Sequence, residues 1–404
     1  SMKLFKRKKI DKIILVMLYK HFEKKDYIAF DIDIIKKYGF NTEIWDLCDL
    51  RYNFPIELPP ESCDGVSIRY FKFLNEIDQY FNNFSVKNHF FIVYPGESND
   101  FFSNYLRKKI VRGRSIYANY YYPLTIHTGI QKSNYKNFLT IIKSYFLNWK
   151  NNPYKTFKDI CCIKNSIIYP SKYELLQGKA CIERVNNKFI RASRKCKILH
   201  SFDYDMHIRE KNNDRIIQNR FAVFIDEYNT GHSDFKKMGI HPPIQNEKKY
   251  FEELNSLFRI IEEKYSLEVV IALHPKSEYC DNPFEGRKMF LYKTQQLIKE
   301  CELCILHTST CFQYILYCKK PFIQVLTSEL IKNKAYFSEM KQYEKLGYSK
   351  IVNAVDIDKS NIDTFINIYD ENKHGQFVEY YLNPYENSDK LNMTMICEYI
   401  GKIR

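Results

Sequence analysis

The stretch from Val269 to Lys276 limits what this chain can fold into more than any other part of it. Its first five residues, ending at Leu273, are aliphatic or β-branched, which is typical of a strand buried on both faces of a parallel sheet. Pro275 then stops the strand, because proline has no N–H to donate to a neighbouring strand. Ligands of open α/β sheets bind at the carboxyl ends of the strands, which is where His274 and Lys276 are expected.

This turn therefore has a candidate chemical role. His274 can hydrogen-bond a phosphate oxygen and, when protonated, neutralise the charge of a departing phosphate. Lys276 adds a point charge to the same turn. The alternative is a histidine that only satisfies a nearby backbone group.

Strand-like and helix-like patterns alternate along most of the chain. The clearest helix runs from 247 to 265, with Tyr250, Leu254 and Ile261 on one apolar face. The sequence predicts strands over 12–18, 88–94, 220–225, 268–273, 303–307 and 321–325 and a short one ending at Asp46, with further helices over 27–38, 101–111, 288–300 and 309–318. A chain of 404 residues is too long for one ordinary core. We therefore expect two Rossmann-like domains facing each other across a cleft, over 1–200 and 201–355, and a helical tail over 356–404 that packs back on them.

The formal net charge of +14 favours anionic partners. The basic residues are scattered and no nucleic-acid module signature occurs, so nucleic acid is not an expected partner. The basic segment Lys3–Lys9 is either a peripheral contact with the inner face of the plasma membrane or a solvated terminus. The apolar segment 10–18 contains Asp11 and Lys12 and is too short to cross a bilayer, so no membrane span is predicted.

The twelve cysteines come without a recognisable secretion signal, which predicts reduced thiols and a cytoplasmic protein. Cys301 and Cys304 have zinc-like spacing, but no second pair follows at a suitable distance. We interpret them, like the pair Cys161–Cys162, as core thiols.

The strand over 220–225 is followed by two adjacent carboxylates, Asp226 and Glu227. A carboxylate at a strand end is well placed to remove the proton of a sugar hydroxyl, and the sequence does not choose between the two. His232 and Asp234 are secondary candidates in the same loop. The alternative is ordinary loop solvation, or a turn capped by Asp226.

A run of three hydroxyl residues, Thr308–Thr310, comes directly after His307 and before a predicted helix. One hydroxyl is enough to cap a helix. The same helix N-terminus also offers free N–H groups to an anion. The length of the run, with His307 beside it, favours ligand binding over capping alone.

In this order and spacing, the three segments resemble bacterial sialyltransferases and related CMP-nonulosonate or CMP-Kdo transferases of the GT-B fold. Asp226-Glu227 resembles the acidic pair of those families, although Gly231 comes four residues after Glu227 instead of directly after it. His274-Pro275 matches their HP motif, and Thr308–Thr310 matches their serine/threonine motif. The resemblance covers 220–330, and the surroundings of the hydroxyl run also resemble capsule and surface-polysaccharide transferases.

The resemblance implies an inverting transfer of a nonulosonic acid (sialic, pseudaminic or legionaminic type) or Kdo from its CMP-activated donor to a surface glycan, lipid-linked ones included. Capsule and lipopolysaccharide are acceptors of this kind. The acidic pair would supply the general base, and His274 with the hydroxyl run would hold the CMP phosphate. The second domain would bind the donor and the first the acceptor.

No metal or other cofactor is expected for this chemistry. The spacing of a metal-binding Asp-x-Asp motif occurs at Asp31 and Asp33, but at the start of a predicted helix. It occurs again at Asp203 and Asp205, between the domains, where acceptor binding or a simple turn is expected.

Three alternatives remain open. The second enzyme hypothesis is a CDP-glycerol or CDP-ribitol polyol-phosphate transferase in cell-surface polymer synthesis. A UDP- or GDP-hexose transferase is the third, although the E-x7-E pattern of retaining enzymes is not evident. A non-catalytic scaffold that binds lipid or nucleic acid is the alternative of a different class.

Overall fold

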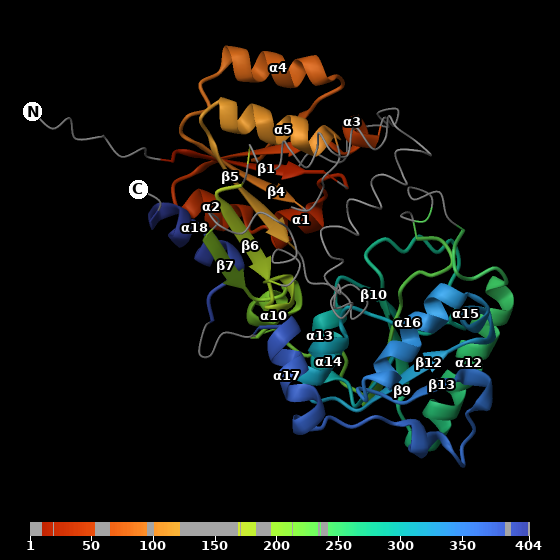
Figure 1. Cartoon of the computed structure of the whole chain (residues 1–404). Helices are drawn as coiled ribbons and strands as arrows, with labels where there is room; N and C mark the ends of the chain where they lie inside the picture. Colours follow the sequence, from red (N-terminus) through yellow and green to blue (C-terminus); the bar gives the residue numbers. More distant parts are fainter. Residues whose placement is uncertain are drawn as a thin grey trace, which may run out of the picture. The chain divides into compact units, whose positions relative to one another are not determined.

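The computed structural model describes residues 10–18, 20–52, 65–94, 101–121, 169, 171–182, 195–211, 213–232, 235, 241–383 and 389–402. These residues divide into two compact units. The first unit contains the described residues up to 202 together with 389–402, and the second contains those from 203 to 383. Figure 1 shows that each unit consists of a sheet covered by helices.

Among the described residues of the first unit, seven strands form one sheet in the order β3-β2-β1-β4-β5-β6-β7. Every neighbouring pair in it is parallel. The strands are β1 (Lys12–Met17), β2 (Asn41–Asp46), β3 (Ser67–Tyr70), β4 (His89–Tyr94), β5 (Ile116–Tyr121), β6 (Tyr173–Gln177) and β7 (Lys195–Leu199).

Helices cover both faces of this sheet (Figure 1). They are α1 (Lys24–Ala29), α2 (Ile32–Lys37), α3 (Cys48–Tyr52), α4 (Leu74–Asn83), α5 (Phe101–Arg112) and α18 (Asn392–Lys402). Side chains of β1 alternate between the two faces, because successive residues of a strand point in opposite directions. Ile13 and Leu15 pack in one cluster with residues of α2 and α18, whereas Ile14 and Val16 pack in another with residues of α4 and α5.

In the second unit, the described strands form a six-stranded parallel sheet in the order β10-β9-β8-β11-β12-β13. They are β8 (Phe221–Ile225), β9 (Glu268–Leu273), β10 (Met289–Leu291), β11 (Leu303–Leu306), β12 (Phe322–Leu326) and β13 (Ile351–Asn353). The chain starts at β8, builds outward through β9 and β10, and then returns to place β11 on the other side of β8. The sheet therefore has a topological switch point between β8 and β11.

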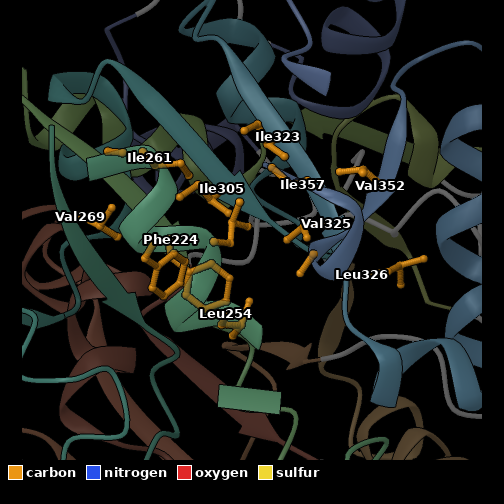
Figure 2. Close-up of a cluster of buried hydrophobic side chains, with 14 of the residues drawn as sticks. Phe224, Leu254, Ile261, Val269, Ile305, Ile323, Val325, Leu326, Val352 and Ile357 are labelled. Carbon is orange, nitrogen blue, oxygen red and sulfur yellow. The ribbon is translucent and has the colours of Figure 1, made fainter. Parts of the chain in front are cut away.

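The helices of this unit are α10 (Phe202–Arg209), α12 (Glu247–Tyr265), α13 (Thr294–Glu300), α14 (Phe312–Tyr317), α15 (Ser328–Lys332), α16 (Lys334–Lys345) and α17 (Glu371–Tyr381), with short 3-10 helices η1 (Ala354–Asp356) and η2 (Ile362–Phe365). Figure 2 shows one face of the sheet, where Phe224, Val269 and Ile305 lie in one buried cluster with Leu254 and Ile261 of α12. The periodicity of α12 predicts this, since its apolar residues recur on the side that faces the sheet.

Several expected elements match closely, and three are wrong. The helix over 247–265 and the strand over 268–273 coincide with α12 and β9. The expected helix over 288–300 is instead β10 followed by α13, and the one over 309–318 begins only at Phe312. The expected helix over 27–38 is divided into α1 and α2 at Asp31, whose φ of 45° is left-handed and ends a helical run.

The helical tail contributes to both units. Helix α17 packs against α14 in the second unit, and α18 packs against α2 in the first. Met393, Ile396 and Ile400 of α18 are buried in the core of the first unit. None of the helices described is both long enough and apolar enough to cross a membrane.

Candidate functional site

The three segments singled out in the sequence follow three neighbouring strands of the second sheet. Strand β8 lies between β9 and β11, so the residues after these strands meet at one edge of the sheet, beside the switch point. Hydrogen bonds join them: Ser277, after β9, donates to Asp226 at 3.0 Å, and Thr308, after β11, donates to Glu227 at 3.3 Å. The fold thus brings together residues that are up to 82 positions apart in the chain, from Asp226 to Thr308.

Asp226 is a buried anchor for the turn after β9. It is 3% exposed and accepts hydrogen bonds from the backbone N–H of Tyr228 and the hydroxyl of Ser277, both at 3.0 Å, and from the hydroxyl of Tyr279 at 3.1 Å. Burial raises the pKa of its carboxyl group. The hydrogen bonds from these donors, and a further one from the backbone of His274, lower the pKa and so offset part of the rise. With both oxygens occupied in this way, we assign Asp226 the role of positioning the His274 turn.

Glu227 differs from Asp226 because one of its oxygens is unpartnered. Its Oε2 accepts hydrogen bonds from the hydroxyl of Tyr336, from the amide of Asn229 at 3.1 Å and from Thr308. Its Oε1 is buried and has no hydrogen-bond partner among the described residues. Burial raises the pKa of Glu227, and it also raises that of Glu339 on α16 to about 7, with the charge of Glu227 as a further cause.

The residues that remain near the surface are those of the His274 turn. His274 and Lys276 are half-buried and Pro275 is exposed. The backbone N–H of Lys276 donates to Nδ1 of His274 at 3.1 Å, so the neutral ring carries its proton on Nε2. The ring of His232 lies beside it, with 4.5 Å between the ring centroids. The fold thus brings His232 and His274 side by side, whereas Asp234 lies outside the described residues.

His307 is not placed to touch a donor. It is fully buried, Nε2 lies 3.0 Å from the hydroxyl of Tyr250, and Nδ1 lies 2.6 Å from the carbonyl oxygen of Val325. The carbonyl must accept, so Nδ1 carries the proton and Nε2 accepts from Tyr250. Burial lowers the pKa of His307 to about 4, which keeps the ring neutral. We therefore interpret His307 as a core residue that joins β11, β12 and α12.

The three residues of the hydroxyl run have different surroundings. Thr308 bonds Glu227, and Ser309, which is 9% exposed, accepts from the backbone N–H of Cys311 at 3.2 Å. Thr310 is exposed. The following helix, α14, begins at Phe312 and has six residues. It is shorter than the helix over 309–318 whose N-terminus the sequence offered as a binding site for an anion. Of the run, Thr310 is the residue that solvent reaches most freely.

Several contributors to this edge carry no sequence signal. Ser277 and Tyr279 lie shortly after the His274 turn, but no motif marks them. Tyr336 and Glu339 come from α16, which follows a strand that is not part of the three-segment pattern. Only the pairing of the strands brings these residues near Asp226 and Glu227.

Asp203, at the start of α10, forms a separate buried site with residues of α13 and α14. It accepts hydrogen bonds from the side-chain amides of Gln295 on α13, at 2.9 Å, and Gln313 on α14, at 3.3 Å. Burial raises its pKa to about 6, although these donors lower it in part. Asp203 therefore ties three helices together and does not lie in the simple turn that the sequence offered as one alternative.

This raised pKa predicts a pH-dependent stability. The folded protein holds the proton of Asp203 more tightly than the unfolded chain, whose ordinary value is 3.8. The stabilisation is therefore complete below pH 3.8 and is lost as the pH rises through about 6, by up to about 3 kcal/mol. Asp203→Asn mimics the protonated form. In urea unfolding followed by circular dichroism, its free energy of unfolding relative to that of the wild type should therefore be higher at pH 7 than at pH 4. Equal differences at both pH values would contradict this.

No protein-family model matches the chain, and no curated protein is significantly similar to it in sequence. The structure of the wall teichoic acid polymerase TagF is similar, with a TM-score of 0.54 at 10% identity over 98% of this chain and 88% of that one. The chain has the GT-B fold. The H548A variant of TagF gives a TM-score of 0.51 at 8% identity, over 97% of this chain and 89% of that one.

A weaker likeness is to the UDP-GlcNAc 2-epimerase from Methanocaldococcus jannaschii, with a TM-score of 0.43 at 12% identity over 96% of this chain and 99% of that one. We draw nothing from it. At such identities the comparisons establish the fold, and the chemistry has to be argued from the residues.

Proposed function

We propose that this protein is a glycosyltransferase that takes a sugar from a nucleotide-activated donor bound by the second unit. The observation that carries the proposal is His274, which stands at the carboxyl end of β9 next to the switch point with Nδ1 occupied by the N–H of Lys276. A ring fixed in this way directs an N–H from Nε2, which suits a phosphate oxygen. The GT-B fold supports the same interpretation by analogy.

The donor we propose is a CMP-activated nonulosonic acid or Kdo, and the reaction is an inverting one. The acceptor oxygen forms a bond to the anomeric carbon while the bond from that carbon to the phosphate oxygen breaks, so that CMP leaves with the electron pair. His274, His232 and Lys276 would stabilise the negative charge that grows on the phosphate. The basis for this donor is the order of the acidic, HP and hydroxyl motifs, since the structures named above are not sialyltransferases.

The acceptor hydroxyl must also lose a proton. Asp226 is buried with both oxygens occupied, and the unpartnered Oε1 of Glu227 is buried as well. A base must come within hydrogen-bond reach of the acceptor. We therefore propose that this carboxylate pair fixes the donor site, and that a group outside the pair accepts the proton.

The remaining parts of the proposal concern partners and location. We propose a surface glycan as the acceptor, catalysis without a metal ion at the phosphate, and a cytoplasmic protein that works at the inner face of the membrane. The net charge of +14 supports both an anionic donor and an anionic membrane surface.

A second candidate is a polyol-phosphate transferase of cell-surface polymer synthesis that uses a CDP-activated polyol. The observation that favours it is the structural likeness to a wall teichoic acid polymerase, with TM-scores of 0.54 and 0.51. In this reaction the acceptor oxygen forms a bond to the phosphorus that carries the polyol, the bond from that phosphorus to the bridging oxygen breaks, and CMP leaves with the electron pair. The same cationic turn would then stabilise the transferred phosphate.

The nucleotide preference tests both candidates. We expect CMP or CDP to raise the unfolding temperature of the full chain more than UDP or GDP does, because a ligand that binds only the folded state stabilises it. His274→Asn keeps an acceptor for the Lys276 N–H but removes Nε2, so nucleotide binding should weaken about tenfold or more. Cys280→Ser, an exposed change in the same loop, is the matched control.

Two results would overturn the proposal. If no nucleotide raised the unfolding temperature, the transferase assignment would fail. If His274→Asn and the control bound nucleotide equally well, the site assignment would fail. Product analysis then separates the candidates, since CMP-sugar cleavage and polyol-phosphate transfer leave different products.

A further inference from the structure

The first unit contains a cluster of metal-binding side chains that is separate from the donor site. His21 lies in the loop after β1, and Cys48 and Asp49 open α3 directly after β2. One ligand atom from each, a ring nitrogen, the sulfur and a carboxylate oxygen, lie within 4.8 Å of one another. His21 Nε2 is 3.0 Å from Asp49 Oδ1. Strands β1 and β2 are neighbours, so the cluster lies at the carboxyl edge of the first sheet.

A fourth residue, Asp46, holds this cluster in place. It is 3% exposed and lies at the end of β2. Its oxygens accept hydrogen bonds from the backbone N–H of Phe22 at 2.9 Å and of Cys48 at 3.3 Å. Asp46 thereby fixes both segments that carry the cluster.

Asp46 also orients the histidine ring. Both of its oxygens lie 3.2 Å from Nδ1 of His21. A carboxylate that accepts the Nδ1–H of a histidine leaves Nε2 with its lone pair available and directs it at a metal. Nε2 is the nitrogen that faces Asp49.

We propose that His21, Cys48 and Asp49 bind a zinc ion, with Asp46 as the outer carboxylate behind the histidine. Nitrogen, thiolate and carboxylate donors are the ligands that Zn²⁺ takes in proteins, at about 2.0–2.3 Å. In a tetrahedral site with these bond lengths, the ligand atoms are separated by about 3.2–3.6 Å. The ligand atoms here need to move by only about 1 Å to reach that geometry.

Binding has a defined proton balance. The thiol of Cys48 releases its proton to solvent when sulfur bonds the metal, and His21 binds through Nε2 while Nδ1 keeps the proton shared with Asp46. Three protein ligands leave the fourth tetrahedral position for water or another ligand. Solvent reaches the site from the side of His21 and Asp49, whose side chains are 32% and 13% exposed, whereas Cys48 is fully buried.

The sequence did not reveal this site because His21 and Cys48 are 27 positions apart and form no zinc motif. The site also does not bear on the expectation that donor chemistry needs no metal, because it belongs to the other unit. The proposal stands whether or not the protein is a glycosyltransferase.

Cobalt substitution tests the proposal on the full chain without an activity assay. Metal-free protein titrated with Co²⁺ should develop the thiolate-to-cobalt charge-transfer band and the visible bands of a tetrahedral ion, and Zn²⁺ should remove both by displacement. Cys48→Ser should abolish the charge-transfer band, and His21→Gln and Asp49→Asn should each weaken Co²⁺ and Zn²⁺ binding at least tenfold. Cys397→Ala, a buried free cysteine elsewhere in the same unit, is the matched control and should bind like the wild type.

A direct metal assay and a folding check complete the test. Elemental analysis after dialysis against Zn²⁺ should find one equivalent lost with Cys48→Ser, while circular dichroism confirms that the variant is folded. An unchanged cobalt spectrum in Cys48→Ser, or the absence of a charge-transfer band in the wild type, would overturn the proposal. His21 would then serve only as an ion-pair partner of Asp46 and Asp49.

Discussion

Replacing Asp226 with alanine is expected to destabilise the second unit by about 3 kcal/mol and to weaken nucleotide binding about a hundredfold. The substitution leaves the Tyr228 N–H and the hydroxyls of Ser277 and Tyr279 without their buried acceptor. Each such group costs about 1–3 kcal/mol when it stays buried, and part of this is offset because the buried carboxylate is itself costly to ionise. The loss of binding follows because the turn that carries His274 is no longer held.

Two further variants separate positioning from direct catalysis. Asp226→Asn keeps an acceptor oxygen in place, so it should retain most of the stability and most of the nucleotide affinity. Ser277→Ala removes one donor to Asp226 and should weaken nucleotide binding slightly. Because the Ser277 hydroxyl is not a base, this loss would reflect positioning alone. If Asp226→Asn kept nucleotide binding but abolished turnover completely, Asp226 would be the base after all and our assignment of a positioning role would be wrong.

Replacing His307 with alanine is expected to destabilise the second unit by about 4 kcal/mol. The change opens a cavity in the core and leaves the Tyr250 hydroxyl and the Val325 carbonyl without their hydrogen-bond partner. His307→Phe fills the volume but supplies neither hydrogen bond, so it should cost less. No tryptophan lies between 203 and 383, so the loss is best measured by hydrogen exchange in peptides that span β11 and β12.

The pKa of His307 adds a pH signature of the opposite sign to that of Asp203. In the folded protein the pKa is lowered from 6.5 to about 4, so the unfolded chain binds the proton more tightly. The stabilisation by neutral His307 is present above pH 6.5 and is lost as the pH falls to about 4, by up to about 3 kcal/mol. His307→Phe should lack this loss. If a His307 variant stayed as stable as the wild type but lost nucleotide affinity, this result would support the contact between His307 and the donor that the sequence predicted.

The fold could be predicted in outline because its elements are marked locally. The apolar face of the helix over 247–265 and the β-branched run before His274 specify α12 and β9 without reference to the rest of the chain. The errors arose where local signals conflict. Met289–Leu291 is too short to separate a strand from the start of a helix, and only its pairing with β9 makes it β10.

The candidate site was found in part for the same reason. The carboxyl ends of parallel strands meet at one edge, so residues after β8, β9 and β11 could be grouped before their contacts were known. Which of them face solvent could not be predicted, because burial depends on neighbours from other segments. Tyr250 and Val325 enclose His307, and Ser277 and Tyr279 enclose Asp226, although no motif connects them.

The sequence by itself determined the alternation of strands and helices, the two-unit α/β plan and the three strand ends where polar residues gather, because hydrophobic periodicity and strand-stopping residues are local properties. Only the tertiary structure decided what each polar residue does there. Packing buries Asp226 and His307 and leaves the His274 turn near solvent. Because burying a polar group without a hydrogen bond is costly, Asp226 and His307 take partners from neighbouring segments. In the same way, the pairing of β1 with β2 brings His21 to Cys48 and Asp49, across a distance in the chain that no motif spans.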